Sequence, residues 1–210
     1  LFYYAMKERE VSMPEIVLGE RAWDAGLTII SGVSGSGKDF FCANAKFAKG
    51  LKVIKLDSIS SRRGDKWITD CAKLKGADVV VGWSDNLSDV AKALRSEYDE
   101  GEPLTLIWIE PSPALFKEIQ AAKARDHQLR HEGEPGAEND AWTADWTRKS
   151  KMSESDVKKY LAQKFELAKK WIVPDEVVVV TNRSAKTPIV NGWHNAPVPG
   201  HEGKGVHQSS

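Results

Sequence analysis

A glycine-rich segment at residues 32–38 has the residue types and the spacing of a site for phosphate groups. Its sequence, GVSGSGK, places four residues between two glycines and a lysine directly after the second. Glycines let backbone amides turn inward around a polyphosphate, and a lysine at this point can bridge the β- and γ-phosphates. We therefore expect a nucleoside triphosphate to bind here. The expected binding residues are Gly32, Val33, Ser34, Gly35, Ser36, Gly37 and Lys38.

The residues on either side of this segment support the same interpretation. The apolar run LTII at 27–30 is typical of a strand leading into the loop, and FFCANAKFA at 40–48 has helical spacing. The positive end of such a helix adds to the attraction for phosphate. A flexible Gly/Ser linker is the alternative, but a linker would not be flanked by a buried strand and an amphipathic helix.

The residue that follows the lysine is unusual. Serine or threonine normally stands there and binds Mg²⁺ through its hydroxyl, whereas this chain has Asp39, followed by Phe40. A carboxylate can also hold Mg²⁺, and its charge would repel the phosphates unless the metal lay between them. We therefore expect Asp39 to be a metal ligand, and we include Asp39 and Phe40 among the nucleotide-binding residues. A degenerate loop in a noncatalytic protein is the alternative.

Short apolar runs rich in β-branched residues alternate with segments of helical spacing along the chain. The runs are almost continuously hydrophobic, as in strands buried on both faces, and strands that alternate with helices form parallel sheets. We therefore expect an α/β protein in which helices cover both faces of a parallel five-stranded sheet, in three layers α/β/α. The expected strands lie at 27–30, 52–56, 78–83, 104–110 and 176–181, and the expected helices at 40–49, 87–98, 113–125 and 155–171.

The tetrapeptide Gly37-Lys38-Asp39-Phe40 resembles the GKD loop of small P-loop kinases, notably phage deoxynucleoside monophosphate kinases and animal phosphomevalonate kinases. The segment GVSGSGK is also similar to gluconate-kinase-type loops. The resemblance implies the P-loop kinase fold with a lid insertion, and transfer of the γ-phosphoryl group of ATP with Mg²⁺. The order of elements agrees from residue 27 to 181, but only the loop is specific. The strand tip that often carries Asp in these kinases reads Gly82-Trp83-Ser84-Asp85 here.

The acceptor side of the expected reaction involves Asp57. It follows the second expected strand, and ligands of open α/β sheets bind beyond the carboxyl ends of the strands. In related kinases an Asp at a similar place accepts the proton of the acceptor hydroxyl, so the resemblance implies a catalytic base or an acceptor anchor. An ordinary helix-capping Asp is the alternative. Arg62 and Arg63 could grip an acceptor phosphate, although paired arginines more often form a solvated surface.

A long polar stretch from His127 to Lys151 interrupts the alternation of strands and helices. Connections of this length are usually functional lids or disordered segments. The resemblance implies a lid at about 123–151 whose cations stabilise the transferring phosphoryl group. The catalytic candidates there are Arg125 and Arg130, with Lys123 and Arg148 next.

Two tryptophans in this stretch, Trp142 and Trp146, are four residues apart. They could stack on a base, or they could form the small core of the lid itself. The segment 181–184 falls where related kinases often contact adenine.

The remaining features limit the class of protein. Its 30 basic and 30 acidic residues cancel, so no global positive field attracts nucleic acid or anionic membranes. The two cysteines suggest reduced thiols in the cytoplasm, and no apolar run approaches the length of a membrane span. We expect a kinase domain at 1–186 and an extended or disordered tail at 187–210.

We expect an ATP-dependent phosphotransferase acting on a nucleoside, a nucleotide or a related small molecule. Three alternatives remain open. The first is a phage kinase acting in the host cytoplasm on hydroxymethylated pyrimidines in DNA, with nucleic acid as its substrate. The second is an ATP-hydrolysing motor or switch, for which Glu110 at the end of LIWIE comes closest to the usual acidic residue. The third is a nucleotide-sensing module without turnover.

Overall fold

The fold was obtained as a computed structural model. The residues that it describes are 17–18, 26–38, 41–42, 46–47, 51–63, 66–84, 87–88, 90–91, 94, 103–131 and 136–182. Across these residues, no helix is both long and apolar enough to cross a membrane. Asp39, Phe40, Asp85, Arg183 and the tail at 187–210 lie outside the described residues, as do the side chains of Arg62 and Arg63.

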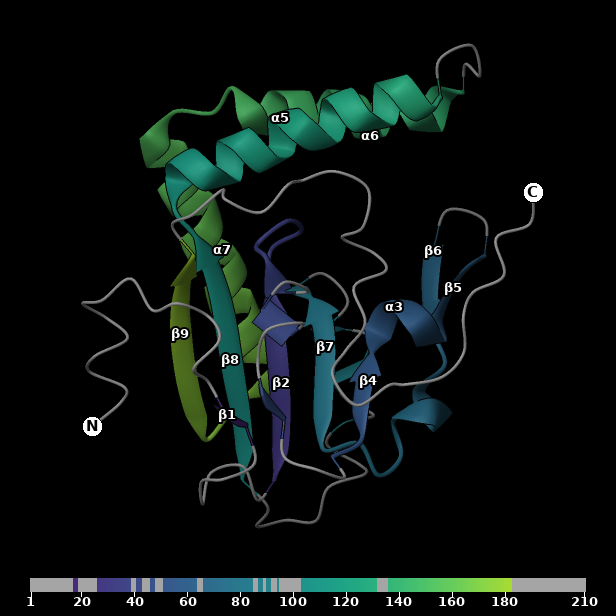
Figure 1. Ribbon diagram of the computed structural model, residues 1–210, viewed down its shortest axis with the longest axis vertical. Helices are drawn as coiled ribbons and strands as arrows, with labels where there is room; N and C mark the ends of the chain where they lie inside the picture. The colour runs from purple at the N-terminus through teal and green to yellow at the C-terminus, as the bar shows by residue number, and fades with distance from the viewer. Residues whose placement is uncertain are drawn as a thin grey trace.

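A parallel sheet of five strands forms the centre of the protein, with the spatial order β4-β7-β2-β8-β9 (Figure 1). The predicted α/β class and the parallel sheet are therefore confirmed. All six residues of β2 are buried, as expected for a strand covered on both faces. The strands span Leu27–Gly32 (β2), Val53–Lys55 (β4), Val79–Trp83 (β7), Leu104–Pro111 (β8) and Glu176–Asn182 (β9).

Alternate residues of the strands point into two separate apolar clusters, one on each face of the sheet. On one face Trp108 packs against Phe165 of the helix α7, with 5.3 Å between the ring centres. On the other face Ile30 and Ile107 pack in a cluster that includes Phe41. Burial on both faces explains why the strand sequences lack a polar side.

The order of the strands reverses beside β2. After β2 the chain passes to β4 at one edge and returns to β7, and it then crosses to β8 and β9 on the opposite side. The carboxyl ends of β2 and β8 therefore lie at the topological switch point, where open α/β sheets generally bind their ligands. The glycine-rich loop starts at this point.

Three long helices follow β8. They are α5 (Pro113–Arg130), α6 (Ala137–Ser150) and α7 (Glu154–Ile172). The Ser112 hydroxyl caps α5 by accepting from the Leu115 amide, and the Ser153 hydroxyl caps α7 by accepting from the Asp156 amide. Figure 1 shows α5 and α6 side by side across the carboxyl ends of the strands.

Much of the polar stretch from His127 to Lys151, for which the sequence predicts a lid or a disordered segment, is helical. The predicted helix at 113–125 continues to Arg130, and most of the following stretch forms α6. Because α6 packs along α5, this tertiary contact stabilises a helix whose own sequence has only a weak apolar face.

Smaller elements surround the sheet. The prediction of a helix at 40–49 is wrong at Lys46–Phe47. These two residues form the short strand β3, which runs parallel to β1 (Val17–Leu18). The strand predicted at 52–56 ends at Lys55, because Leu56 begins the one-turn helix α3 (Leu56–Ile59). An antiparallel ribbon that the sequence did not reveal follows, β5 (Ser60–Arg63) with β6 (Lys66–Thr69), and then the 3₁₀ helix η3 (Cys71–Leu74).

Candidate functional site

The backbone of the glycine-rich loop takes conformations that only glycine adopts readily. Gly35 has a φ of 85° and Gly37 a φ of 95°, both in the left-handed region. The Ser36 amide donates to the Val33 carbonyl at 2.9 Å and closes a tight turn. The Phe41 amide donates to the Gly37 carbonyl at 2.8 Å, so a helix begins as the loop ends. The order strand, glycine loop, helix is thus present at the switch point.

The first glycine of the loop is required by packing as well. A Cβ at Gly32 would lie 2.4 Å from the Ser36 Oγ and 2.5 Å from the Ile109 carbonyl oxygen. Both distances are shorter than real contacts, so no side chain fits between the loop and the neighbouring strand β8. Gly32 lets the loop fold back closely at the end of β2.

The helix α5 lies directly against the loop. The Gln120 amide group donates to the Ser34 carbonyl at 3.0 Å, and the Lys123 ammonium donates to the Ser34 hydroxyl at 2.7 Å. A Cβ at Gly35 would lie 2.4 Å from the Ile119 side chain. Three residues on one face of α5 therefore fix the position of the loop and bring a cation to its rim.

Lys38 stands at the first helical position after the loop and is only 7% exposed. Its ammonium lies 6.0 Å from the centre of the Trp83 ring, within the range of a cation–π contact. Trp83 ends β7 and pairs in register with Gly32, where the loop begins. Lys38 and Trp83 thus lie together at the carboxyl ends of two adjacent strands.

Asp57 is half-buried in the first turn of α3, immediately after β4. Since β7 lies between β4 and β2, Asp57 is two strands from the loop strand. Strand spacing puts that separation at about 10 Å. A Cβ at Gly82 would lie 2.3 Å from the Leu56 side chain, so α3 packs closely on β7 beside Asp57.

The two predicted lid arginines differ in their surroundings from Lys123. Arg130 is exposed and forms an ion pair with Asp126, one turn before it on α5. Arg125 is exposed, and it lies about 200° around the helix from Lys123, on the far side from the loop contact. Lys123 is the one of these three cations with a contact to the loop among the described residues. The catalytic roles of Arg125 and Arg130 stay predictions.

The tryptophans of α6 pack with α5. The Trp142 and Trp146 rings meet edge-on at 5.5 Å, and each also contacts the ring of His127. A hydrogen bond of 3.2 Å joins the His127 Nδ1 to the Thr143 hydroxyl. Burial lowers the pKa of His127, and the neighbouring His131 and Arg130 lower it further. These contacts favour the interpretation that the tryptophans form the core between α5 and α6.

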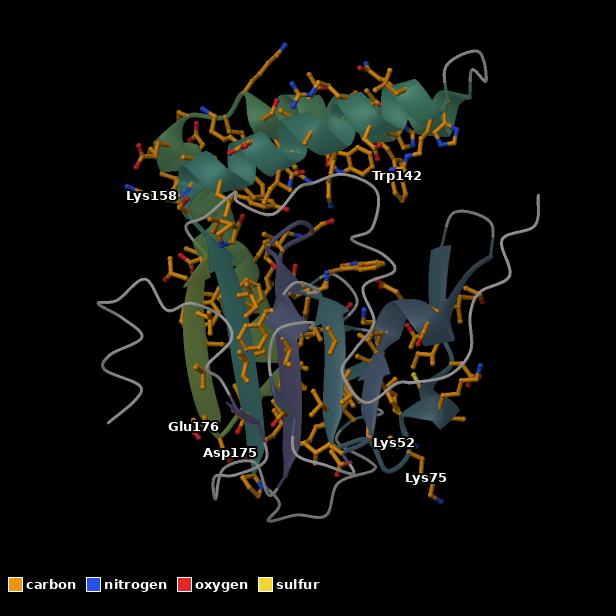
Figure 2. The ribbon with its side chains drawn as sticks, in the orientation of Figure 1. Lys52, Lys75, Trp142, Lys158, Asp175 and Glu176 are labelled. Carbon is orange, nitrogen blue, oxygen red and sulfur yellow. The ribbon has the colours of Figure 1, made fainter. Side chains whose placement is uncertain are left out.

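Part of Trp142 remains accessible, with 41% of its surface exposed. Figure 2 shows it on the side of the α5–α6 pair that faces the strand ends. The Trp146 ring also lies 5.8 Å from the Lys123 ammonium, so α6 helps to hold the cation at the loop.

Glu110 lies near the carboxyl end of β8, one residue after the Gly32 partner Ile109. It is half-buried, and burial raises the pKa of its carboxyl group. The sequence points to Glu110 only under the alternative of an ATP-hydrolysing motor or switch, through its position at the end of an apolar strand.

Replacing Glu110 with glutamine tests this burial. Because the folded state raises the pKa, the stability that Glu110 contributes is present below its ordinary pKa of 4.5 and is lost as the pH rises through the raised value. We expect Glu110→Gln to increase the free energy of unfolding relative to the wild type at pH 7, but much less at pH 4. Urea unfolding at both pH values measures this difference. The control, Glu118→Gln, alters an exposed residue of α5 and should show no such pH-dependent gain.

Comparison with known proteins finds no match: no family model fits the chain, and no curated protein or solved structure is significantly similar to it. The functional assignment therefore depends on the loop and its surroundings.

Two residues at the loop are absent from the predicted catalytic and binding residues: Gln120 and Trp83. Gln120 is 1% exposed in the middle of a helix, and a polar residue between the apolar Phe116, Ile119 and Ala124 was a signal that its side chain meets a polar group. Lys123 is among the lid cations that the sequence predicts, but the sequence places it after Arg125 and Arg130, because helical spacing alone does not show which face of α5 contacts the loop.

Proposed function

We propose that the protein is a Mg²⁺-dependent phosphotransferase with the three-layer P-loop kinase fold. It transfers the γ-phosphoryl group of ATP to a hydroxyl group of a nucleoside, a nucleotide or a related acceptor in the cytoplasm. The observation that carries the proposal is the loop at 32–38. Two of its glycines have a left-handed backbone conformation, and they precede a lysine at the start of a helix. The resemblance of the GKD sequence to small kinases supports the same assignment.

The donor side of the proposed reaction uses the loop residues. Loop amides and the Lys38 ammonium bind the β- and γ-phosphates, and the beginning of the helix adds a positive dipole. Lys123 lies within 2.7 Å of the loop residue Ser34 and can supply a second positive charge as charge develops on the transferring group. In this proposal Lys123 is the main lid cation at the loop, and Arg125 and Arg130 are secondary candidates.

The proposed metal ligand is Asp39. No group of three or more His, Cys, Asp or Glu side chains that could hold a metal occurs among the described residues. Mg²⁺ at phosphoryl-transfer sites is commonly held by one or two carboxylates together with phosphates and water, so a single carboxylate beside the loop fits. When bound, the metal neutralises negative charge between the phosphates.

The acceptor side of the proposed reaction uses Asp57. The acceptor oxygen attacks the γ-phosphorus, the bond from that phosphorus to the β–γ bridging oxygen breaks, and ADP leaves with the bond electrons. Asp57 takes the proton of the attacking hydroxyl. The helices α5 and α6, which lie across the strand ends, restrict the access of water.

We expect Asp57→Asn to lower phosphoryl transfer by about 100-fold while leaving ATP affinity unchanged, because an amide cannot accept the proton. Initial rates of acceptor phosphorylation and the dissociation constant of ATP separate the two effects. Asp70→Asn is the matched control, since Asp70 is exposed and pairs with Lys73 three residues away. Full transfer activity in Asp57→Asn would refute the role of Asp57 as the base.

The test of the function is the fate of the γ-phosphoryl group. The full chain is incubated with γ-labelled ATP and Mg²⁺, alone and with pools of nucleosides, nucleotides or hydroxymethylated DNA. We expect label in one acceptor pool at a rate well above the release of free phosphate. Release of free phosphate at the same rate with and without every pool would contradict a kinase, and label in DNA alone would identify the kinase acting on modified pyrimidines.

A second candidate, an ATP-hydrolysing switch, is favoured by one observation. Glu110 lies beside the loop strand at the switch point, where a carboxylate can orient an attacking water molecule. Under this alternative, Glu110→Gln would abolish the release of free phosphate, whereas a kinase would retain transfer to its acceptor.

A further inference from the structure

The strand β7 separates the two sides of the proposed reaction, and its last residue carries a large flat ring. The first four residues of β7 are buried, whereas Trp83 at its carboxyl end is partly exposed. On one side of β7 lies β2 with the phosphate loop, and on the other lies β4, which leads into Asp57. Trp83 therefore occupies the position between the donor residues and the proposed base.

One contact places this ring beside the donor residues, and a second contact holds α3, which carries Asp57, against β7. The Lys38 ammonium lies 6.0 Å from its centre, so the ring borders the place where the transferring phosphate would be held. On the other side the close packing of Leu56 on Gly82 holds α3 against β7. An acceptor whose hydroxyl reaches both Asp57 and the γ-phosphate would have to pass over or beside Trp83.

We propose that Trp83 is the platform on which the acceptor stacks, and that the acceptor therefore carries a flat heteroaromatic ring such as a nucleobase. This inference rests on the proposed phosphotransferase function. Tryptophan rings bind bases face to face with little regard to sequence, because every base has a π-face. A sugar acid or an aliphatic alcohol has no such face. The ring can belong to a free nucleoside or nucleotide, or to a base in DNA.

The test compares Trp83→Leu and Trp83→Phe with the wild type. We expect the leucine variant to raise the acceptor KM by about 5- to 150-fold, the range given by loss of one stacked base. Loss of the contact with Lys38 should change the KM for ATP by no more than about 5-fold. The phenylalanine variant keeps an aromatic face and should recover most of the acceptor affinity. Far-ultraviolet circular dichroism establishes that both variants fold.

The outcomes separate this inference from the function on which it rests. Equal increases in both KM values, with no recovery in Trp83→Phe, would assign Trp83 to positioning Lys38 and would overturn the platform. Label transferred only to a polyol or an aliphatic alcohol would keep the phosphotransferase and overturn the aromatic acceptor. Transfer to no acceptor at all would overturn both. Parallel assays with nucleosides, nucleotides and single-stranded hydroxymethylated DNA distinguish a free base from one in a polymer.

Discussion

Replacing Lys38 with alanine is expected to lower ATP-dependent phosphoryl transfer by about 100- to 1,000-fold, the usual cost of removing one group that stabilises developing charge. The side chain is 7% exposed at the start of the helix that follows the loop, and no other cation occupies the same place in the described loop. The measurement is the initial rate of label transfer from ATP at saturating acceptor.

The matched control for this prediction is Lys75→Ala. Figure 2 shows Lys75 at the end of the molecule opposite the α5–α6 pair, so its loss changes the same charge far from the loop. We expect wild-type transfer from the control. An equal loss in both variants would mean that net charge, and not the position of Lys38, determines the rate.

Replacing Gly35 with alanine is expected to lower the free energy of unfolding by about 2 to 5 kcal/mol, from the left-handed backbone and from overpacking together. The new Cβ would lie 2.4 Å from the Ile119 side chain at a φ of 85°. Because α5 and the loop would have to separate, ATP affinity should also fall. Urea unfolding and ATP titration measure the two effects.

Gly76→Ala isolates the backbone part of this effect. Gly76 has a φ of 66°, but a Cβ there would meet nothing within 4 Å. We expect it to cost only about 1 to 2 kcal/mol and to leave ATP affinity unchanged. If the two alanine variants lost the same stability and the same affinity, the packing of α5 on the loop would have no energetic importance.

The sheet was predictable from the sequence because its central strands β2, β7 and β8 are buried on both faces. A strand with one face in solvent alternates apolar and polar residues. Runs such as LTLIWIE and EVVVVT are apolar at most positions, so they indicate a parallel sheet directly. The conformation of the glycine-rich loop was predictable for a different reason: its glycines are required by local backbone geometry, and at Gly35 and Gly37 that geometry is present.

The α5–α6 pair was not predictable in the same way. The sequence of α6 is polar with two tryptophans, and its helix depends on contacts with α5 that lie outside its own residues. The same limit applies to the site. The contact between Lys123 and Ser34 joins residues 89 positions apart, so spacing along one helix could not rank Lys123 above Arg125. The predicted roles of Asp39 and Phe40 concern residues outside the described part of the chain.

The most direct test of the central claim is equilibrium binding of ATP to the full chain, in Mg²⁺ and in a chelator. The loop geometry predicts one ATP bound per chain in Mg²⁺, a strong loss of affinity in Lys38→Ala, and weaker binding when Mg²⁺ is removed because Asp39 then faces the phosphates without a metal. Saturable binding that Lys38→Ala leaves unchanged, or no binding of ATP by the folded wild-type chain, would contradict the assignment of residues 32–38 as a phosphate site.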